Sequence, residues 1–242
     1  MILDINLFFV FIILFASILQ TSSGFGFSIM ATPFLLILFL PYEAIQINLI
    51  LSLIISILLL SKIKDHIDFI LIKRLFIGSI LGIPCGIFIF KSIDTNVLKL
   101  LIAVIILILT ILLIFNLKIK SSKNKDYIIG GISACLTSSI GMPGPPLLLY
   151  FTGINISKEK LRATTLAFYL FIYSFSLISQ IIFVGTNHTI WKYSIYSIPI
   201  VFMGLIIGQI FFKYLNQNTF KIFTFILLFC TSITLFIEVL LK

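Results

Sequence analysis

Two short polar stretches interrupt an otherwise apolar chain, and they carry the side chains best suited to hold a small solute. The first reads TSSGFGF from Thr21 to Phe27, and the second reads TSSIGMPG from Thr137 to Gly144. Hydroxyls can donate to oxyanion oxygens, and glycine lets the backbone approach a ligand closely. A helix that begins after such a break presents unpaired N–H groups and a partial positive charge. The two stretches therefore predict a site for a small anion.

The predicted site extends to residues at the starts of two later apolar segments. Arg162 is expected at the mouth of the site, either as an anion ligand or as a cation that orients the chain. Asn48 and Thr164 lie further along their segments and could bind the solute or hydrogen-bond between helices. The candidate substrate-binding residues are Thr21, Ser22, Ser23, Gly24, Gly26, Asn48, Thr137, Ser138, Ser139, Gly141, Gly144, Arg162 and Thr164. The hydroxyls could instead bond back to carbonyls of their own helices, with the glycines serving helix packing.

The other reactive side chains do not form a pattern typical of an enzyme or a metal site. The cysteines at 85, 135 and 230 are scattered without CxxC or Cys/His spacing. The carboxylates and both histidines fall in loops or near segment ends, so an intramembrane serine hydrolase would lack a general base. Nucleotide-binding motifs are absent. We expect no catalytic residue, no metal and no cofactor.

Composition indicates the environment in which such a site must be built. Of the 242 residues, 60% are hydrophobic and 10% are charged, and the mean hydropathy is +1.25. This composition is typical of an integral membrane protein. The net charge of +9 comes from cations clustered between apolar runs, which indicates membrane orientation rather than nucleic-acid binding. The first apolar run lacks a basic flank and a cleavage site, and we expect it to be retained.

Ten apolar segments can be distinguished, and they predict an all-α bundle. They cover residues 5–20, 27–40, 44–60, 69–90, 97–117, 127–142, 143–156, 161–184, 190–212 and 219–241. A full span needs roughly 20 residues, so 27–40 and 143–156 are short, and both follow a polar break. The expected architecture is eight full spans plus two broken or re-entrant hairpins, or ten spans.

Lysine and arginine predict the orientation, because cytoplasmic loops retain them. Counting crossings from the loop around Lys62 places most cations on the cytoplasmic side: Lys62, Lys64, Lys73, Arg74, Lys118, Lys120, Lys123, Lys125, Lys158, Lys160, Arg162, Lys213 and Lys221. Lys91, Lys99, Lys192 and Lys242 remain outside. Both termini are then predicted to be extracytoplasmic.

Weak internal similarity predicts that the two halves form an inverted repeat. An offset of 116 residues places Thr21-Ser22-Ser23 on Thr137-Ser138-Ser139, and an offset of 122 places Gly82 and Gly86 on Gly204 and Gly208. These paired glycines are expected at helix contacts. The predicted 5+5 bundle has a first repeat at 1–117, a basic cytoplasmic linker at 118–126 and a second repeat at 127–242.

These features resemble the TauE/SafE family of sulfite-exporter-like membrane proteins. The resemblance rests on inverted halves that each open with a small-residue break, a short apolar run and then Pro-x-Glu (41–43) or Lys-Glu (158–159). The family's breaks are usually richer in glycine. The resemblance implies export of a small sulfur oxyanion or organosulfonate, such as sulfite, thiosulfate or sulfoacetate, across a bacterial inner membrane. The alternative is a drug/metabolite-type 5+5 exporter of amino acids or neutral metabolites. Coupling and oligomeric state remain open.

Overall fold

Helices form all of the regular structure in the residues that the computed structural model describes, which are 7–94, 97, 100, 104, 107, 108, 111, 122–151, 154 and 156–214. They are α1 (Leu7–Ser23), α2 (Phe27–Leu38), α3 (Pro41–Ile63), the 3-10 helix η1 (Lys64–His66), α4 (Phe69–Ser92), α6 (Lys123–Ile140), α7 (Gly144–Phe151), α8 (Lys158–Phe183) and α9 (His188–Tyr214). Most of the predicted segment 97–117 and all of 219–241 lie outside the described residues.

Four of these helices are long and apolar enough to cross a membrane. They cover Pro41–His66, Phe69–Ser92, Lys158–Phe183 and His188–Lys213. The apolar helices Leu7–Ser23 and Phe27–Leu38 are shorter. The prediction of an all-α integral membrane protein is therefore confirmed. Helices α1 and α2 are consecutive and contact each other, as do α6 and α7.

Polar caps fix where several helices begin. Ser157 accepts a hydrogen bond from Lys160 N at the start of α8. Ser122 does the same for Lys125 N, so α6 begins at Lys123. The cap places the first turn of α6 inside residues 118–126, which the sequence had suggested as a linker. The start of α6 was not predicted from the sequence, because a lysine-rich stretch carries no apolar periodicity. In the structure the Ser122 side chain accepts a hydrogen bond from Lys125 N and so stabilises the first turn.

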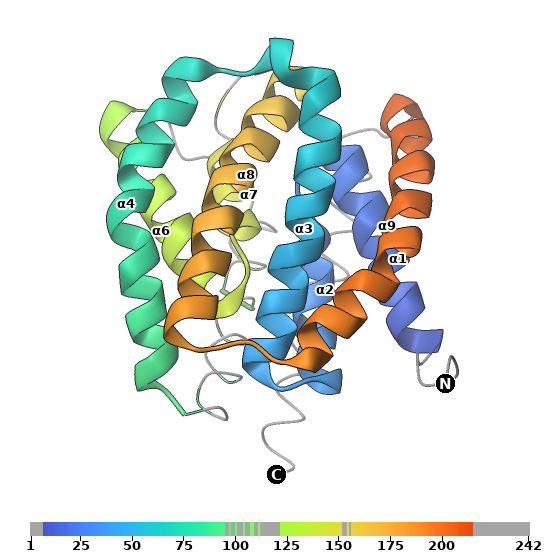
Figure 1. Ribbon diagram of the computed structural model, residues 1–242. Helices are drawn as coiled ribbons and strands as arrows, with labels where there is room; N and C mark the ends of the chain where they lie inside the picture. The colour runs from blue at the N-terminus through green and yellow to red at the C-terminus, as the bar shows by residue number, and fades with distance from the viewer. Residues whose placement is uncertain are drawn as a thin grey trace.

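Helices α3 and α8 lie side by side and antiparallel in the middle of the bundle (Figure 1). Helices α4 and α6 lie on one side of this central pair, and α1 and α9 lie on the other. Much of α3 is buried all round, as expected for a helix that contacts other helices on every side.

Glycine permits two close parallel contacts at the flanks. A Cβ atom at Gly82 of α4 would lie 2.2 Å from the Gly131 carbonyl oxygen of α6, and one at Gly86 would lie 2.2 Å from the Cys135 oxygen. A Cβ at Gly204 of α9 would lie 2.4 Å from Ser17 Cβ of α1. The prediction that these glycines mediate helix packing is confirmed.

One end of the bundle collects most of the described cations. Ion pairs of 2.9 Å join Arg74 to Asp126 and Lys160 to Asp68 there. Asp126 lies in the first turn of α6, near a loop as the sequence suggested. Its side chain is nevertheless only 1% exposed, and it also accepts a hydrogen bond from Tyr150. We call this the basic end. Its described cations are Lys62, Lys64, Lys73, Arg74, Lys123, Lys125, Lys158, Lys160, Arg162 and Lys213.

Candidate functional site

Both predicted breaks are present as interruptions between helices. Helix α1 ends at Ser23 and α2 begins at Phe27, with Gly24 at φ 86° and Gly26 at φ 130° between them. Helix α6 ends at Ile140 and α7 begins at Gly144, with Gly141 at φ 73°. Positive φ values are readily adopted only by glycine. The glycines therefore allow the backbone to reverse at each of the two breaks.

Five of the six hydroxyls before the breaks donate within their own helices, whereas Thr21 Oγ1 has no partner among the described residues. Ser22 and Ser23 donate to the Leu19 carbonyl, and Ser23 also contacts the Phe25 carbonyl. On α6 the same back-bonding joins Thr137 to Ser133 O, Ser138 to Ala134 O and Ser139 to Cys135 O, at 2.6–2.7 Å. A hydroxyl carries one proton, so these five groups are engaged within the protein. Other donors must be considered for a ligand.

The helices that follow the breaks begin close to each other. A Cβ atom at Gly144 would lie 2.9 Å from Ile29 Cδ1 and 3.2 Å from the Tyr169 hydroxyl. Ser28, in the first turn of α2, lies 3.1 Å from the Tyr173 hydroxyl. Tyr169 and Tyr173 occupy the middle of α8. The starts of α2 and α7 therefore meet against the centre of α8, and we call these contacts the central cluster.

The first turn of α2 offers main-chain donors to this cluster. Gly26 provides no side-chain cap, and the first helical hydrogen bond of α2 runs from Met30 N to Gly26 O. The N–H groups of residues 27–29 precede that bond and point out of the helix end. Helix α7 contributes fewer donors, because Pro145 and Pro146 follow Gly144 and have no N–H.

Helix α3 supports the two hairpins through a polar stripe. Asn48 donates to the Gly141 carbonyl of the second break at 2.7 Å. Gln20 of α1 donates to the Ser52 carbonyl at 3.1 Å and to Ser56 Oγ at 3.2 Å. The i, i+4 spacing of Asn48, Ser52 and Ser56 puts them on one helical face.

Helix α8 supports the second hairpin in a similar way. Gln180 donates to the Ser138 carbonyl at 2.7 Å, and Ser176 contacts Ser138 Oγ at 3.4 Å. Thr165, Tyr169 and Tyr173 continue the stripe at i, i+4 spacing. None of the residues Tyr169, Tyr173, Ser28, Gln20 and Gln180 was among the candidates predicted from the sequence, although polar residues at this spacing within an apolar helix are a usable signal.

Several polar atoms in and beside the cluster remain available. Among the described residues, the Tyr169 hydroxyl of the cluster is buried without a hydrogen-bond partner, as are Thr165 Oγ1 and Asn48 Oδ1 of the adjoining stripes. Tyr169 is fully buried. Buried polar groups are usually satisfied, so the Tyr169 hydroxyl in particular can donate to a bound solute at no cost to an existing contact.

The remaining candidates occupy three different places. Thr21 faces α9, because a Cβ atom added at Gly208 would lie 2.6 Å from the Cβ atom of Thr21. Thr164 accepts a hydrogen bond from Asp68 N at 2.9 Å and so holds the connection between α3 and α4. Arg162 is buried beside Gly24 of the first break. Thr21 thus belongs to the last turn of α1 but faces α9, and of Thr164 and Arg162 only Arg162 contacts a break.

Comparison with known proteins identifies the class to which this arrangement belongs. The family model described as sulfite exporter TauE/SafE matches residues 9–235. Searches of curated proteins and of solved structures gave no match. The match spans the hairpins, the central helices and both glycine contacts. The chain therefore belongs to the TauE/SafE family of sulfite exporters.

Proposed function

We propose that the protein carries a small sulfur oxyanion or organosulfonate, such as sulfite, thiosulfate or sulfoacetate, across the membrane and binds it at the central cluster. The observation that carries this proposal is the meeting of the α2 and α7 starts at Tyr169 and Tyr173. Family membership supports transport of a sulfur-containing anion.

The chemistry of the central cluster favours an anion over a cation. Its available donors are the first-turn N–H groups of α2 and the Tyr169 hydroxyl. A helix start favours negative charge. The described carboxylates, by contrast, lie at helix ends or in connections: Glu43, Asp65, Asp68, Asp94, Asp126 and Glu159. An anion bound at the cluster therefore meets donors without a nearby negative side chain.

The helix contacts support a 5+5 inverted repeat as the framework of the carrier. In the proposed repeat, α1 corresponds to α6 and α4 to α9. The parallel glycine contact of α4 with α6 then has its counterpart in that of α9 with α1. The repeat boundaries remain at 1–117 and 127–242, with each hairpin entering the membrane from the opposite side.

The clustering of cations supports a cytoplasmic position for the basic end, with both termini extracytoplasmic in an inner membrane. An anion leaving the cell then moves down the membrane potential. This gain is about 2.3 kcal/mol per charge per 100 mV, so export needs no coupling ion.

The test removes one donor from the central cluster. Tyr169→Phe should lower sulfite flux into proteoliposomes about 10- to 100-fold, since a hydrogen bond to a charged group contributes roughly 1.5–3 kcal/mol. Tyr196→Phe is the matched control, because Tyr196 is 47% exposed on α9. The control should transport like the unmodified protein.

Two results would contradict the proposal. One is normal sulfite flux through a correctly inserted Tyr169→Phe variant, which would move the site elsewhere. The other is transport of neutral amino acids or metabolites but of none of the sulfur anions, which would favour the drug/metabolite-type exporter.

A further inference from the structure

We infer a second anion site at the basic end, formed by Arg162 and Lys158 of α8 beside the α1–α2 turn, where the transported oxyanion binds before or after the central cluster. This inference rests on the proposed function. It assigns to Arg162 the task of selecting negatively charged solutes at one entrance.

Arg162 is buried without a negative partner in the part of the chain that the structure describes. The residue is 5% exposed, and its Nε has no hydrogen-bond partner among the described residues. Of the acids at this end, Asp68 pairs with Lys160 and Asp126 with Arg74, each at 2.9 Å. Glu159 of α8 and Asp65 of η1 also lie at this end, but among the described residues neither forms an ion pair with Arg162. An uncompensated buried charge is costly, so the position of Arg162 favours an anion from outside the protein.

Lys158 brings a second positive charge to the same place. It precedes Arg162 by four residues, and side chains at this spacing share a helical face, where like charges repel. The Lys158 ammonium lies 5.0 Å, and the Arg162 guanidinium 4.2 Å, from the centre of the Phe212 ring of α9. The ring stabilises each cation only partly. An oxyanion between them would neutralise both, and guanidinium geometry suits a planar pair of oxygens.

The location connects this pair to the first break. A Cβ atom at Gly24 would lie 2.9 Å from Arg162 Cα and 3.2 Å from its carbonyl oxygen. Gly24 is three residues before Phe27, where the donors of α2 begin. A solute released by Arg162 therefore reaches the α2 start by passing the turn that Arg162 contacts.

The experiment measures anion-dependent stability in a neutral detergent. Sodium sulfite is titrated under nitrogen against sodium gluconate at equal ionic strength, with the full chain. The melting temperature should rise by about 5–10 °C when sulfite reaches roughly 100 times its Kd. Arg162→Gln should reduce this rise, because only the central cluster then binds sulfite. Arg162→Lys should reduce it less, and Lys62→Gln, which removes an exposed cation at the same end, should keep all of it.

The unliganded proteins separate binding from a structural role. Removing an unpaired buried charge should leave the melting temperature in gluconate unchanged or higher. A lower melting temperature for Arg162→Gln in gluconate, with the full sulfite-dependent rise retained, would overturn the inference. So would a rise that appears only with added phosphatidylglycerol, because the ligand would then be a lipid headgroup.

Failure of this inference is distinguishable from failure of the proposed function. If Tyr169→Phe abolishes flux while Arg162→Gln keeps normal sulfite flux and the normal sulfite-dependent rise, the central cluster stands and the second site falls. If the unmodified protein carries no sulfur anion, the proposed function falls whatever the melting data show.

Discussion

At the scale of single residues, Asp68 shows how one side chain joins a helix to its neighbour. Its carboxylate accepts hydrogen bonds from Ile70 N and Leu71 N and so caps α4, and it also pairs with Lys160 of α8. Partial burial raises the pKa of this carboxyl, but hydrogen bonding and charge from Lys160 and the two N–H groups outweigh burial. The net pKa lies below 3.8.

We predict that Asp68→Ala destabilises the protein by about 0.5–2 kcal/mol, the usual value of an N-cap. Asp68→Asn should cost less, because the amide oxygen still caps α4 while only a partly exposed ion pair is lost. The pKa of Asp68 in the folded protein lies below its ordinary value. The stability that the Asp68 charge contributes is therefore fully present above about pH 4 and is lost as the pH falls through the lowered pKa. Thermal melts at pH 7 and pH 3 measure it, and an equal Asp68→Asn deficit at both pH values would contradict the assignment.

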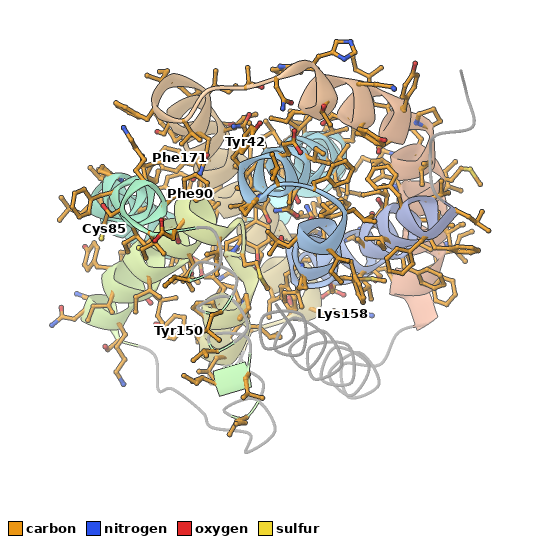
Figure 2. The ribbon with its side chains drawn as sticks, turned by 90° about the horizontal axis from the view of Figure 1, so that it is seen from below. Tyr42, Cys85, Phe90, Tyr150, Lys158 and Phe171 are labelled. Atoms are coloured by element: carbon orange, nitrogen blue, oxygen red, sulfur yellow. The ribbon has the colours of Figure 1, made fainter. Side chains whose placement is uncertain are left out.

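At the scale of elements, the connection between α8 and α9 closes the end opposite the basic end. Gln46 of α3 donates to the Gly185 carbonyl at 2.7 Å. Asn187 donates to Glu43 Oε1 at 2.6 Å and to the Tyr42 hydroxyl at 2.9 Å, and it accepts from Ile190 N. Tyr42 lies beside this connection when the bundle is viewed from that end (Figure 2).

We predict that Asn187→Asp weakens this closure in a pH-dependent way. The new carboxylate can still cap α9 but replaces a donor with a charge that repels Glu43. The variant should lose about 1–3 kcal/mol at pH 7 and recover stability at pH 5, where two adjacent carboxyls can share a proton. Asn187→Ser keeps a cap oxygen without the charge and should show no such recovery. Equal pH profiles for the two variants would count against a direct Glu43 contact.

The helical elements and both breaks were predictable because their signals are local. Apolar runs define the helices, and Gly24, Gly26 and Gly141 mark reversals that few other residues allow. The central cluster was not predictable in the same way. The i, i+4 spacing of Tyr169 and Tyr173 indicates a polar stripe on α8, but only their contacts with Gly144 and Ser28 show that this stripe faces the breaks. Arg162 packs against Phe212, which lies fifty residues later in the chain. The sequence alone was therefore equally compatible with Arg162 as an exposed cation that orients the protein in the membrane.

At the scale of the whole molecule, we predict that the basic end faces the cytoplasm. In a chain with Cys85, Cys135 and Cys230 replaced by alanine, a cysteine at Thr186 should react with a membrane-impermeant maleimide added to intact cells. A cysteine at Asp65 should react only after the cells are opened. Both positions are exposed, so access alone decides the result. The reverse pattern would invert the proposed orientation.

The parallel contact of α1 with α9 has a consequence for biosynthesis. Ser17 and Thr21 face Gly204 and Gly208, which the ribosome adds nearly the whole chain later. Until α9 emerges, the first helix must reside in lipid or beside the insertion machinery with its polar face uncovered. The opening hairpin can therefore reach its final depth only near the end of translation, and truncation before α9 should leave it exposed to quality-control proteases.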